Sequence, residues 1–111
     1  MSDCLFCKIA KGNSSKIYED SDLVIIKDIA PQAQLHYLVI PKEHYSNILE
    51  ISANNENLLT KIFKKITELS NTLGLSEGFR LITNVGENGC QSIQHLHIHL
   101  LGGEKLSEKM G

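Results

Sequence analysis

One segment near the end of the chain alternates between histidine and apolar residues. It reads His95-Leu96-His97-Ile98-His99-Leu100-Leu101 and is followed by Gly102-Gly103. Because successive side chains of a β-strand point to opposite faces, the pattern predicts a strand with the histidines on one face, about 7 Å apart, and the apolar residues on the other. The chain is therefore expected to contain a sheet with one apolar face and one face that carries imidazoles.

The row of histidines also predicts a functional site. A single buried histidine is usually structural, but three aligned imidazoles must each be desolvated and hydrogen-bonded, and an inert core gains nothing from them. Two chemistries suit such a row. One is metal coordination, and the other is attack by a neutral imidazole on an electrophile while a second imidazole assists the leaving group. The spacing alone does not choose between them.

The remaining pattern predicts one main helix and four further strands. Apolar residues recur every three or four positions over residues 54–73, with Gly74 as the expected C-terminal cap. Strands are expected at residues 16–18, 23–29, 35–40, 80–85 and 93–101. Only the connection that contains the helix is long enough for a parallel crossover. We therefore expect an α+β fold, a five-stranded antiparallel sheet with the helix on one face.

Length and composition limit the class of protein. At 111 residues the chain has the length of one domain, expected to span residues 1–111. Its 41% hydrophobic and 22% charged residues are typical of a folded chain and predict no membrane partner. The formal charge of -2 leaves no basic stripe for a nucleic-acid polymer.

The N-terminal region and the cysteines predict the compartment. Residues 1–10 contain neither a basic segment nor a long apolar run, so no export signal is expected there. Three cysteines are an odd number, which argues against a disulfide framework and fits a reducing environment. We therefore expect a cytoplasmic protein.

Ser92 could be mistaken for the nucleophile of a serine hydrolase. It follows the turn at residues 86–91 and leads into the histidine strand, so there is no strand-to-helix elbow of the Gly-x-Ser-x-Gly type. Ser92 is either an auxiliary hydroxyl near the site or a turn serine that caps backbone groups.

At this point the residues resemble a known family. The segment from His95 to Leu101 is similar to the His-x-His-x-His motif that names the histidine triad (HIT) proteins. Residues 28–33, 36–44 and 84–92 resemble the Hint-like branch of that family in order and spacing, so the resemblance covers the chain from about residue 4 to residue 103. It implies a five-stranded antiparallel sheet with a short N-terminal helix, a homodimer, and a purine nucleotide bound against the histidine strand.

The resemblance also implies catalytic roles. In the family the middle histidine is the nucleophile, so His97 would attack the α-phosphorus and form a nucleotidyl-histidine that water hydrolyses. An imidazole, with a reference pKa of about 6.5, is largely neutral near pH 7 and attacks without a strong base. The residues given catalytic roles in this way are His36, Ser92, His97 and His99.

Substrate contacts follow from the same resemblance. Asn84 and His99 would contact the phosphate, Asp28 would hold the ribose, and apolar side chains would form the walls of the base pocket. Ser92 and the backbone from Cys90 would lie near the leaving group. The full set is Phe6, Ile9, Asp28, Ile29, Asn84, Cys90, Gln91, Ser92, His97 and His99.

Cys4 and Cys7 form a C-x-x-C pair. Both thiolates could reach one zinc ion, but two ligands do not complete a tetrahedral site. Free cysteines are one alternative, and a redox pair is another, although it lacks its usual strand-then-helix context. Some bacterial HIT proteins with such a pair bind zinc, and the resemblance implies a structural Zn²⁺ held by Cys4, Cys7, His44 and His95.

The leading hypothesis is a hydrolase of purine nucleoside phosphoramidates or related adenylated compounds, because Asn84 and the Gln91-Ser92 turn resemble the Hint-like branch. The alternatives are a Fhit-type dinucleoside polyphosphate hydrolase, a non-catalytic nucleotide-binding interaction module, and a catalytic metal on all three histidines. The sequence departs from the Hint-like pattern at two places. Cys90 replaces a common glycine, and its side chain either narrows the leaving-group pocket or exposes a reactive thiol. Residues 104–111 lack the usual tryptophan, which leaves selectivity for the leaving group open.

Overall fold

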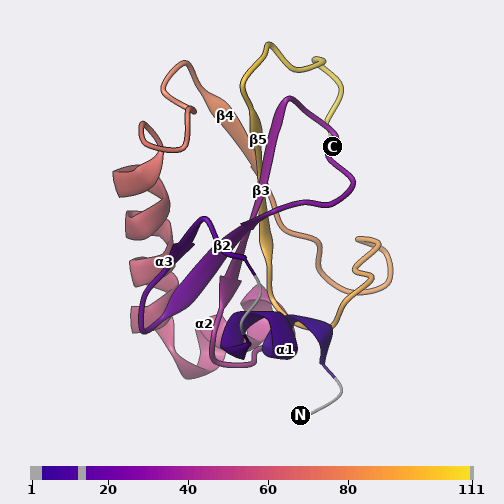
Figure 1. Ribbon diagram of the computed structural model, residues 1–111. Coiled ribbons are helices and arrows are strands. Elements are labelled where there is room, and N and C mark those ends of the chain that lie inside the picture. Colours follow the sequence, from indigo (N-terminus) through magenta and orange to yellow (C-terminus); the bar gives the residue numbers. More distant parts are fainter. Residues whose placement is uncertain (1–3, 13–14, 111) are drawn as a thin grey trace.

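Figure 1 shows the computed structural model, which describes residues 4–12 and 15–110. The ends of the predicted domain, residues 1–3 and 111, lie outside these ranges. Within them, no helix combines the length and apolar character needed to cross a bilayer. The elements in order are α1 (Leu5–Lys11), β1 (Tyr18–Glu19), β2 (Leu23–Lys27), β3 (Leu35–Pro41), α2 (Ile48–Asn54), α3 (Glu56–Leu69), β4 (Phe79–Ile82) and β5 (Ile98–Gly102).

The strands form one five-stranded sheet in the order β1-β2-β3-β5-β4, and every pairing is antiparallel. This confirms the predicted sheet. The last strand of the chain, β5, lies between β3 and β4, so segments distant in sequence become neighbours. In the β3–β5 register His36 is opposite Leu101, and Leu38 is opposite His99. The histidine-bearing strand is therefore central rather than at an edge.

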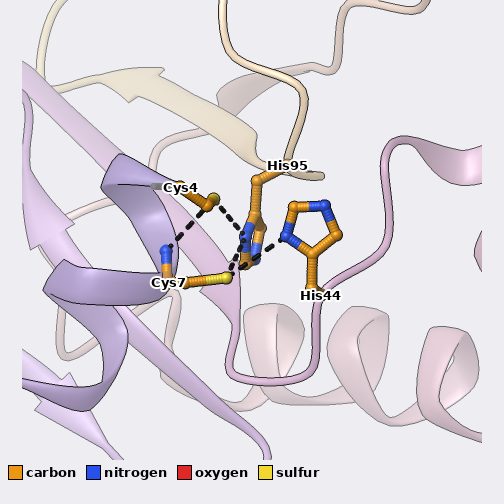
Figure 2. A group of neighbouring side chains, drawn as sticks. All are labelled: Cys4, Cys7, His44 and His95. Carbon is orange, nitrogen blue, oxygen red and sulfur yellow. Dashed lines mark hydrogen bonds between the residues drawn. The ribbon is translucent and has the colours of Figure 1, made fainter. Parts of the chain in front are cut away.

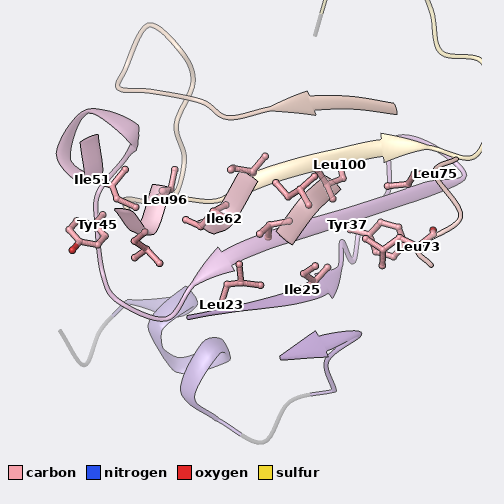
Figure 3. Packing of buried hydrophobic residues seen from close by; sticks show 14 residues of the cluster. Leu23, Ile25, Tyr37, Tyr45, Ile51, Ile62, Leu73, Leu75, Leu96 and Leu100 are labelled. Carbon is pink, nitrogen blue, oxygen red and sulfur yellow. The ribbon is translucent and has the colours of Figure 1, made fainter. Parts of the chain in front are cut away.

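The two faces of the sheet have different partners. The large core lies between the sheet and the helices α2 and α3, with Ile25, Ile62 and Leu100 almost fully buried in it (Figure 3). On the other face α1 contributes Phe6 to a smaller cluster whose buried members are Phe6, Ala10, Val24, Leu38 and Ile40. Since Leu100 points into the large core, its neighbour His99 faces the other side.

The predicted helix over residues 54–73 is wrong at both ends. The structure has α3 over Glu56–Leu69, preceded by α2, which the sequence pattern did not predict. Asn55 separates the two helices: its backbone is not helical, its side chain accepts from the Leu58 N–H, and its own N–H donates to the Ile51 carbonyl. Gly74 does have a positive φ of 83°, but it is the last residue of the turn at residues 70–74 and does not directly follow α3.

The predicted histidine strand is also too long. It was expected over residues 93–101, but β5 begins at Ile98, so His95 and His97 precede it. Continuing the β3–β5 register would pair Pro41 with Leu96, and proline has no N–H to donate to the ladder. Leu96 instead donates to the Tyr45 carbonyl in the loop after β3.

The other strands were found with small errors in their bounds. β1 occupies Tyr18–Glu19 instead of residues 16–18, and β2 ends at Lys27 rather than at residue 29. β4 occupies Phe79–Ile82 instead of residues 80–85. Strands end where inter-strand hydrogen bonding stops, which local hydrophobic pattern does not specify.

The helix-covered core makes a prediction about stability. Ile62 on α3 has no exposed surface, whereas its neighbour Phe63 is 44% exposed. We expect Ile62→Ala to lower the free energy of unfolding by about 3 kcal/mol because it leaves a cavity. The control Phe63→Ala should cost about 1 kcal/mol or less. Urea denaturation measures both, and equal losses would contradict the assigned orientation of α3.

Candidate active site and metal cluster

Three histidine rings form a row on the face of the sheet opposite the large core. The ring centroids of His97 and His99 are 5.2 Å apart, and those of His36 and His99 are 5.1 Å apart. The Phe6 ring from α1 lies edge-on to the His97 ring, with their centroids 4.8 Å apart. His95 precedes β5, as His97 does, and its ring lies on this same side of the sheet, where it faces Cys4 and Cys7 at the start of α1 and has the Phe6 ring edge-on with centroids 6.2 Å apart.

Hydrogen bonding determines which nitrogen of His97 is free. Its Nδ1 lies 2.8 Å from the His95 carbonyl oxygen, which only accepts, so in the neutral ring Nδ1 carries the proton. The lone pair is therefore on Nε2. The Thr83 hydroxyl donates to the His97 carbonyl at 2.8 Å and holds the backbone on the other side. This arrangement gives His97 a nucleophilic Nε2.

A second chain of hydrogen bonds orients His99. The Gln32 N–H donates to His36 Nδ1 at 3.0 Å, so the proton of the neutral His36 ring is on Nε2. That Nε2 lies 2.9 Å from His99 Nδ1 and 3.4 Å from the Asp28 carboxylate. With Nδ1 accepting, the neutral His99 ring carries its proton on Nε2 and is available as a donor.

Burial lowers the pKa of His99, and positive charge on His97 or His36 would lower it further, while Asp28 opposes the shift. His99 is therefore neutral near pH 7. A neutral donor next to an imidazole with a free Nε2 is an arrangement that serves attack on an electrophile carrying anionic oxygens.

The loop before the histidines is held by its own side chains. Asn84 Nδ2 donates to the Gly89 carbonyl at 2.7 Å. The buried Gln91 accepts from the Gly86 N–H through Oε1 and donates through Nε2 to the Ser46 and Ile93 carbonyls. The side chain of Gln91 thus binds backbone groups of its own loop and connects that loop to Ser46 in the loop after β3.

Two further residues of this loop are exposed. Ser92 lies directly after Gln91 and three residues before His95. Cys90 has a positive φ of 60°, the only such non-glycine residue in the described part of the chain. The left-handed conformation explains why glycine suits this position, since a Cβ there is strained.

The residues expected around the nucleoside are only partly brought together. Phe6 is buried, and Ile9 packs on its cluster. Ile29 is fully exposed, so the described chain does not bring it to Phe6. Asp28 is oriented by the Ala30 N–H, which donates to its Oδ1 at 2.8 Å.

Cys4, Cys7, His44 and His95 form a compact cluster (Figure 2). Cys4 Sγ and Cys7 Sγ lie 3.2 and 3.4 Å from His95 Nδ1, and Cys7 Sγ lies 3.2 Å from His44 Nδ1. The four ligand atoms lie within 4.8 Å of one another. The cluster thus joins the start of α1, the loop after β3 and the segment before β5.

The donor set fits a tetrahedral metal ion of the zinc type. His95 Nε2 lies 2.8 Å from the Pro41 carbonyl, so the proton is on Nε2 and the Nδ1 lone pair faces the two thiols. Burial raises the pKa of Cys7, an effect that the neighbouring Cys4 reinforces. A bound dication offsets the cost of burying thiolates, and two sulfurs with two imidazoles are ligands that zinc prefers.

Asp28, His36 and His99 also have ligand atoms within 4.8 Å of one another. Their surroundings differ from those of the cysteine cluster. A metal on His36 Nε2 would require a proton on Nδ1, where the Gln32 N–H already donates. This group therefore fits a hydrogen-bond chain better than a metal site.

A pocket of about 460 Å³ borders His99 and Asn84. The sequence analysis missed the residues that line it from β4 and the C-terminal segment, which include Arg80, Ile82, Leu106, Ser107 and Lys109. In the β4–β5 register Arg80 is opposite Leu101 and Ile82 is opposite His99, so both share the histidine face. The sequence carries no local signal for this register.

Comparisons with known proteins agree with this geometry. A family model described as "Scavenger mRNA decapping enzyme C-term binding" matches residues 3–111. Protein HitA of Neisseria gonorrhoeae is 40% identical over 104 residues, which cover 92% of this chain and 97% of that protein. A HIT family hydrolase from Clostridium thermocellum has 43% identity and a TM-score of 0.90, covering 99% of this chain and 98% of that one. A histidine triad protein from Clostridium difficile has 37% identity and a TM-score of 0.90, with the same coverage.

The lowered pKa of His99 makes stability depend on pH. Because burial disfavours the charged ring, the unfolded chain binds more protons below the ordinary histidine pKa of 6.5. The contribution of His99 is complete above about pH 6.5 and is lost as the pH falls toward the lowered pKa. We expect urea titrations from pH 7.5 to 5 to show a smaller loss of stability for His99→Asn than for wild type. Parallel curves would contradict this prediction.

Proposed function

The chain belongs to the histidine triad (HIT) family, and from this premise we propose that it hydrolyses purine nucleoside 5′-phosphoramidates or related adenylated compounds through a covalent intermediate on His97. Structural neighbours named as HIT family hydrolases support hydrolase chemistry. The observation that carries the proposal is the 2.8 Å contact of His97 Nδ1 with the His95 carbonyl oxygen, which assigns the proton to Nδ1 and leaves Nε2 free beside His99.

In the first step His97 Nε2 forms a bond to the α-phosphorus while the P–N bond of the substrate breaks. The leaving nitrogen takes up one proton from solvent and departs as the free amine, because the proton on His97 Nδ1 stays hydrogen-bonded to the His95 carbonyl. In the second step water gives its hydroxyl to phosphorus and its other proton to solvent, which releases the nucleoside monophosphate and the free imidazole. Splitting one displacement into two in this way lowers the barrier of each.

The other site residues support this reaction. The Nε2–H of His99 can donate to a phosphoryl oxygen in both steps, and the Asp28–His36 pair keeps that proton on the correct nitrogen. Asn84 is the second phosphate contact, and Ser92 lies near the leaving group. Phe6 and Ile9 face the base, with Asp28 near the ribose.

Asn84 favours a Hint-like phosphoramidase over a Fhit-type dinucleoside polyphosphate hydrolase, because glutamine tends to occupy this position in the Fhit branch. The family resemblance also supports a homodimer in the cytoplasm. In the described structure β4 is an edge strand whose Leu81 is 42% exposed, and an unpaired edge of this kind is suited to association.

Intact-protein mass spectrometry after brief mixing with an adenosine phosphoramidate tests the mechanism. Wild type should gain the mass of an adenylyl group transiently. His97→Ala and His97→Gly should lose the adduct, and turnover should fall by at least about 10³-fold because the nucleophile is absent. Unchanged circular dichroism would show that both variants fold. Turnover without any adduct in wild type would overturn the covalent mechanism, and binding without turnover would favour an interaction module.

We also propose that Cys4, Cys7, His44 and His95 hold a structural Zn²⁺. Bound there, the ion would supply thiolate and imidazole cross-links between α1 and the segment before β5. Four protein ligands leave no open position for substrate, which is typical of structural rather than catalytic zinc.

Metal analysis of the purified protein should find one zinc per chain. Cys4→Ser and Cys7→Ser should weaken zinc binding by more than about 100-fold, since changes outside the ligand shell already cost 10–100-fold. Cys90→Ser is the matched control, because Cys90 is exposed and outside the cluster. Equal zinc content in all three variants would refute the assignment.

A further inference from the structure

Thr83 lies beside the proposed nucleophile but has no role in the mechanism above. The pairing of β4 with β5 ends where Ile82 is opposite His99, and β5 itself begins at Ile98. Thr83 and His97 therefore both lie just beyond the paired strands. There the Thr83 hydroxyl donates to the His97 carbonyl at 2.8 Å. A side chain thus joins the two segments at the point where the strand pairing has ended.

The contacts of the His97 ring do not fix its segment in the sheet. Its Nδ1 lies 2.8 Å from the His95 carbonyl oxygen, a contact that spans two residues of the same segment. That contact orients the ring relative to residue 95 but moves with the segment as a whole. The Phe6 ring lies edge-on to the His97 ring and limits it on one side. The position of the His97 backbone therefore depends on bonds that reach outside the segment.

Two hydrogen bonds hold this backbone from opposite sides. In the strand order β5 lies between β3 and β4. On the β3 side the Leu96 N–H donates to the Tyr45 carbonyl, in the loop after β3, at 2.6 Å. On the β4 side the His97 carbonyl accepts from the Thr83 hydroxyl. Removing that hydroxyl would take away a bond that holds His97 toward β4 and would leave the Leu96 bond in place.

The chain neighbours of Thr83 connect it to the proposed phosphate contacts. Ile82, directly before it, is opposite His99, the proposed donor to a phosphoryl oxygen. Asn84, directly after it, is the second proposed phosphate contact. The Thr83 hydroxyl therefore fixes the His97 backbone relative to the segment that carries these contacts.

Attack on phosphorus depends on this placement. The reacting atoms must approach to about 3–3.5 Å with their orbitals aligned, and a misplacement of about 1 Å can cost about 10²-fold in rate. A group that holds a catalytic side chain need not touch the substrate, because hydrogen bonds behind the reacting residue maintain its geometry. The Thr83 hydroxyl, which binds a backbone carbonyl, is a group of this kind.

We propose that Thr83 is a positioning residue for His97, and that its hydroxyl fixes the approach of His97 Nε2 to a phosphorus held by His99 and Asn84. This inference rests on the proposed function and deepens it. The hydroxyl is the required group, and the β-branched shape of threonine is not. Nucleotide binding should then depend little on Thr83, whereas the rate of attack should depend on it strongly.

Three variants test the proposal by separating the hydroxyl from the shape of the side chain. Thr83→Val removes the hydroxyl and keeps the shape, Thr83→Ala removes both, and Thr83→Ser keeps the hydroxyl. One measured quantity is the rate constant of adduct formation at saturating adenosine phosphoramidate, followed by intact-protein mass spectrometry. The other is the Kd of adenosine monophosphate, measured by calorimetry, which reports binding without the chemical step.

We expect Thr83→Val and Thr83→Ala to slow adduct formation about 10- to 100-fold, because the attacking nitrogen is no longer held in place. The Kd of adenosine monophosphate should change by less than about 3-fold, since the lost interaction acts on the reaction and not on binding. Thr83→Ser should keep the rate constant within about 5-fold of wild type, because the donor to the His97 carbonyl remains.

Thr67→Val is the matched control. Thr67 Oγ1 donates to the Lys64 carbonyl at 2.8 Å, a bond of the same type and length, but on α3 and therefore on the other side of the sheet. Its rate constant should stay within about 2-fold of wild type. Thermal melts followed by circular dichroism identify an assay temperature at which every variant is folded.

The outcomes separate the two levels of the argument. If wild type forms the adduct and the variants without the hydroxyl form it at the same rate, the inference is wrong and the proposed function stands. The same conclusion follows if Thr83→Ser is as slow as Thr83→Val, or if weaker binding accounts for the whole effect. If wild type binds adenosine monophosphate but forms no adduct and turns over no phosphoramidate, the proposed function fails and the inference fails with it.

Discussion

The structure on the histidine face depends on one residue, His95, whose ring and backbone are both engaged. Its side chain has no exposed surface. Nε2 donates to the Pro41 carbonyl, Nδ1 faces the two thiols, and the main-chain carbonyl accepts from His97 Nδ1. The residue that completes the cysteine cluster is therefore also the one that orients His97, the proposed nucleophile. A shift of His95 would disturb both sites, because the interior has little room to absorb it.

The cysteine cluster and the Asp28–His36–His99 group contain similar residue types but differ in the backbone group that binds one histidine of each. In the cysteine cluster His95 Nε2 donates to the Pro41 carbonyl, so the lone pair of His95 Nδ1 faces the thiols. In the other group the Gln32 N–H donates to His36 Nδ1, so the proton of the neutral His36 ring is on Nε2 and faces His99. The residue types that could bind a metal are common to both groups. The polarity of one backbone contact distinguishes a metal ligand from a proton donor.

The parts of this structure that follow from local pattern were predictable from the sequence. Alternation around His97 and His99 predicted an apolar and a polar face, and the sheet confirms it. The same alternation could not reveal that pairing stops after Pro41, because strand ends depend on the partner strand. The cysteine cluster came from family resemblance and not from spacing, since Cys4 and His95 are far apart in the chain. Arg80 and Lys109 were missed because their proximity to His99 depends on register and on the path of the C-terminal segment.

The separation of Cys4 and His95 along the chain, 91 residues, also constrains biosynthesis. The first helix leaves the ribosome well before its partner His95, which is made 91 residues after Cys4. Contacts of such long range form late, because a loop of this length must close before they stabilise anything. Until then the thiols of Cys4 and Cys7 have no imidazole from His95 beside them. A nascent or truncated chain that stops before residue 95 therefore lacks both the closed cluster and the proposed nucleophile, His97.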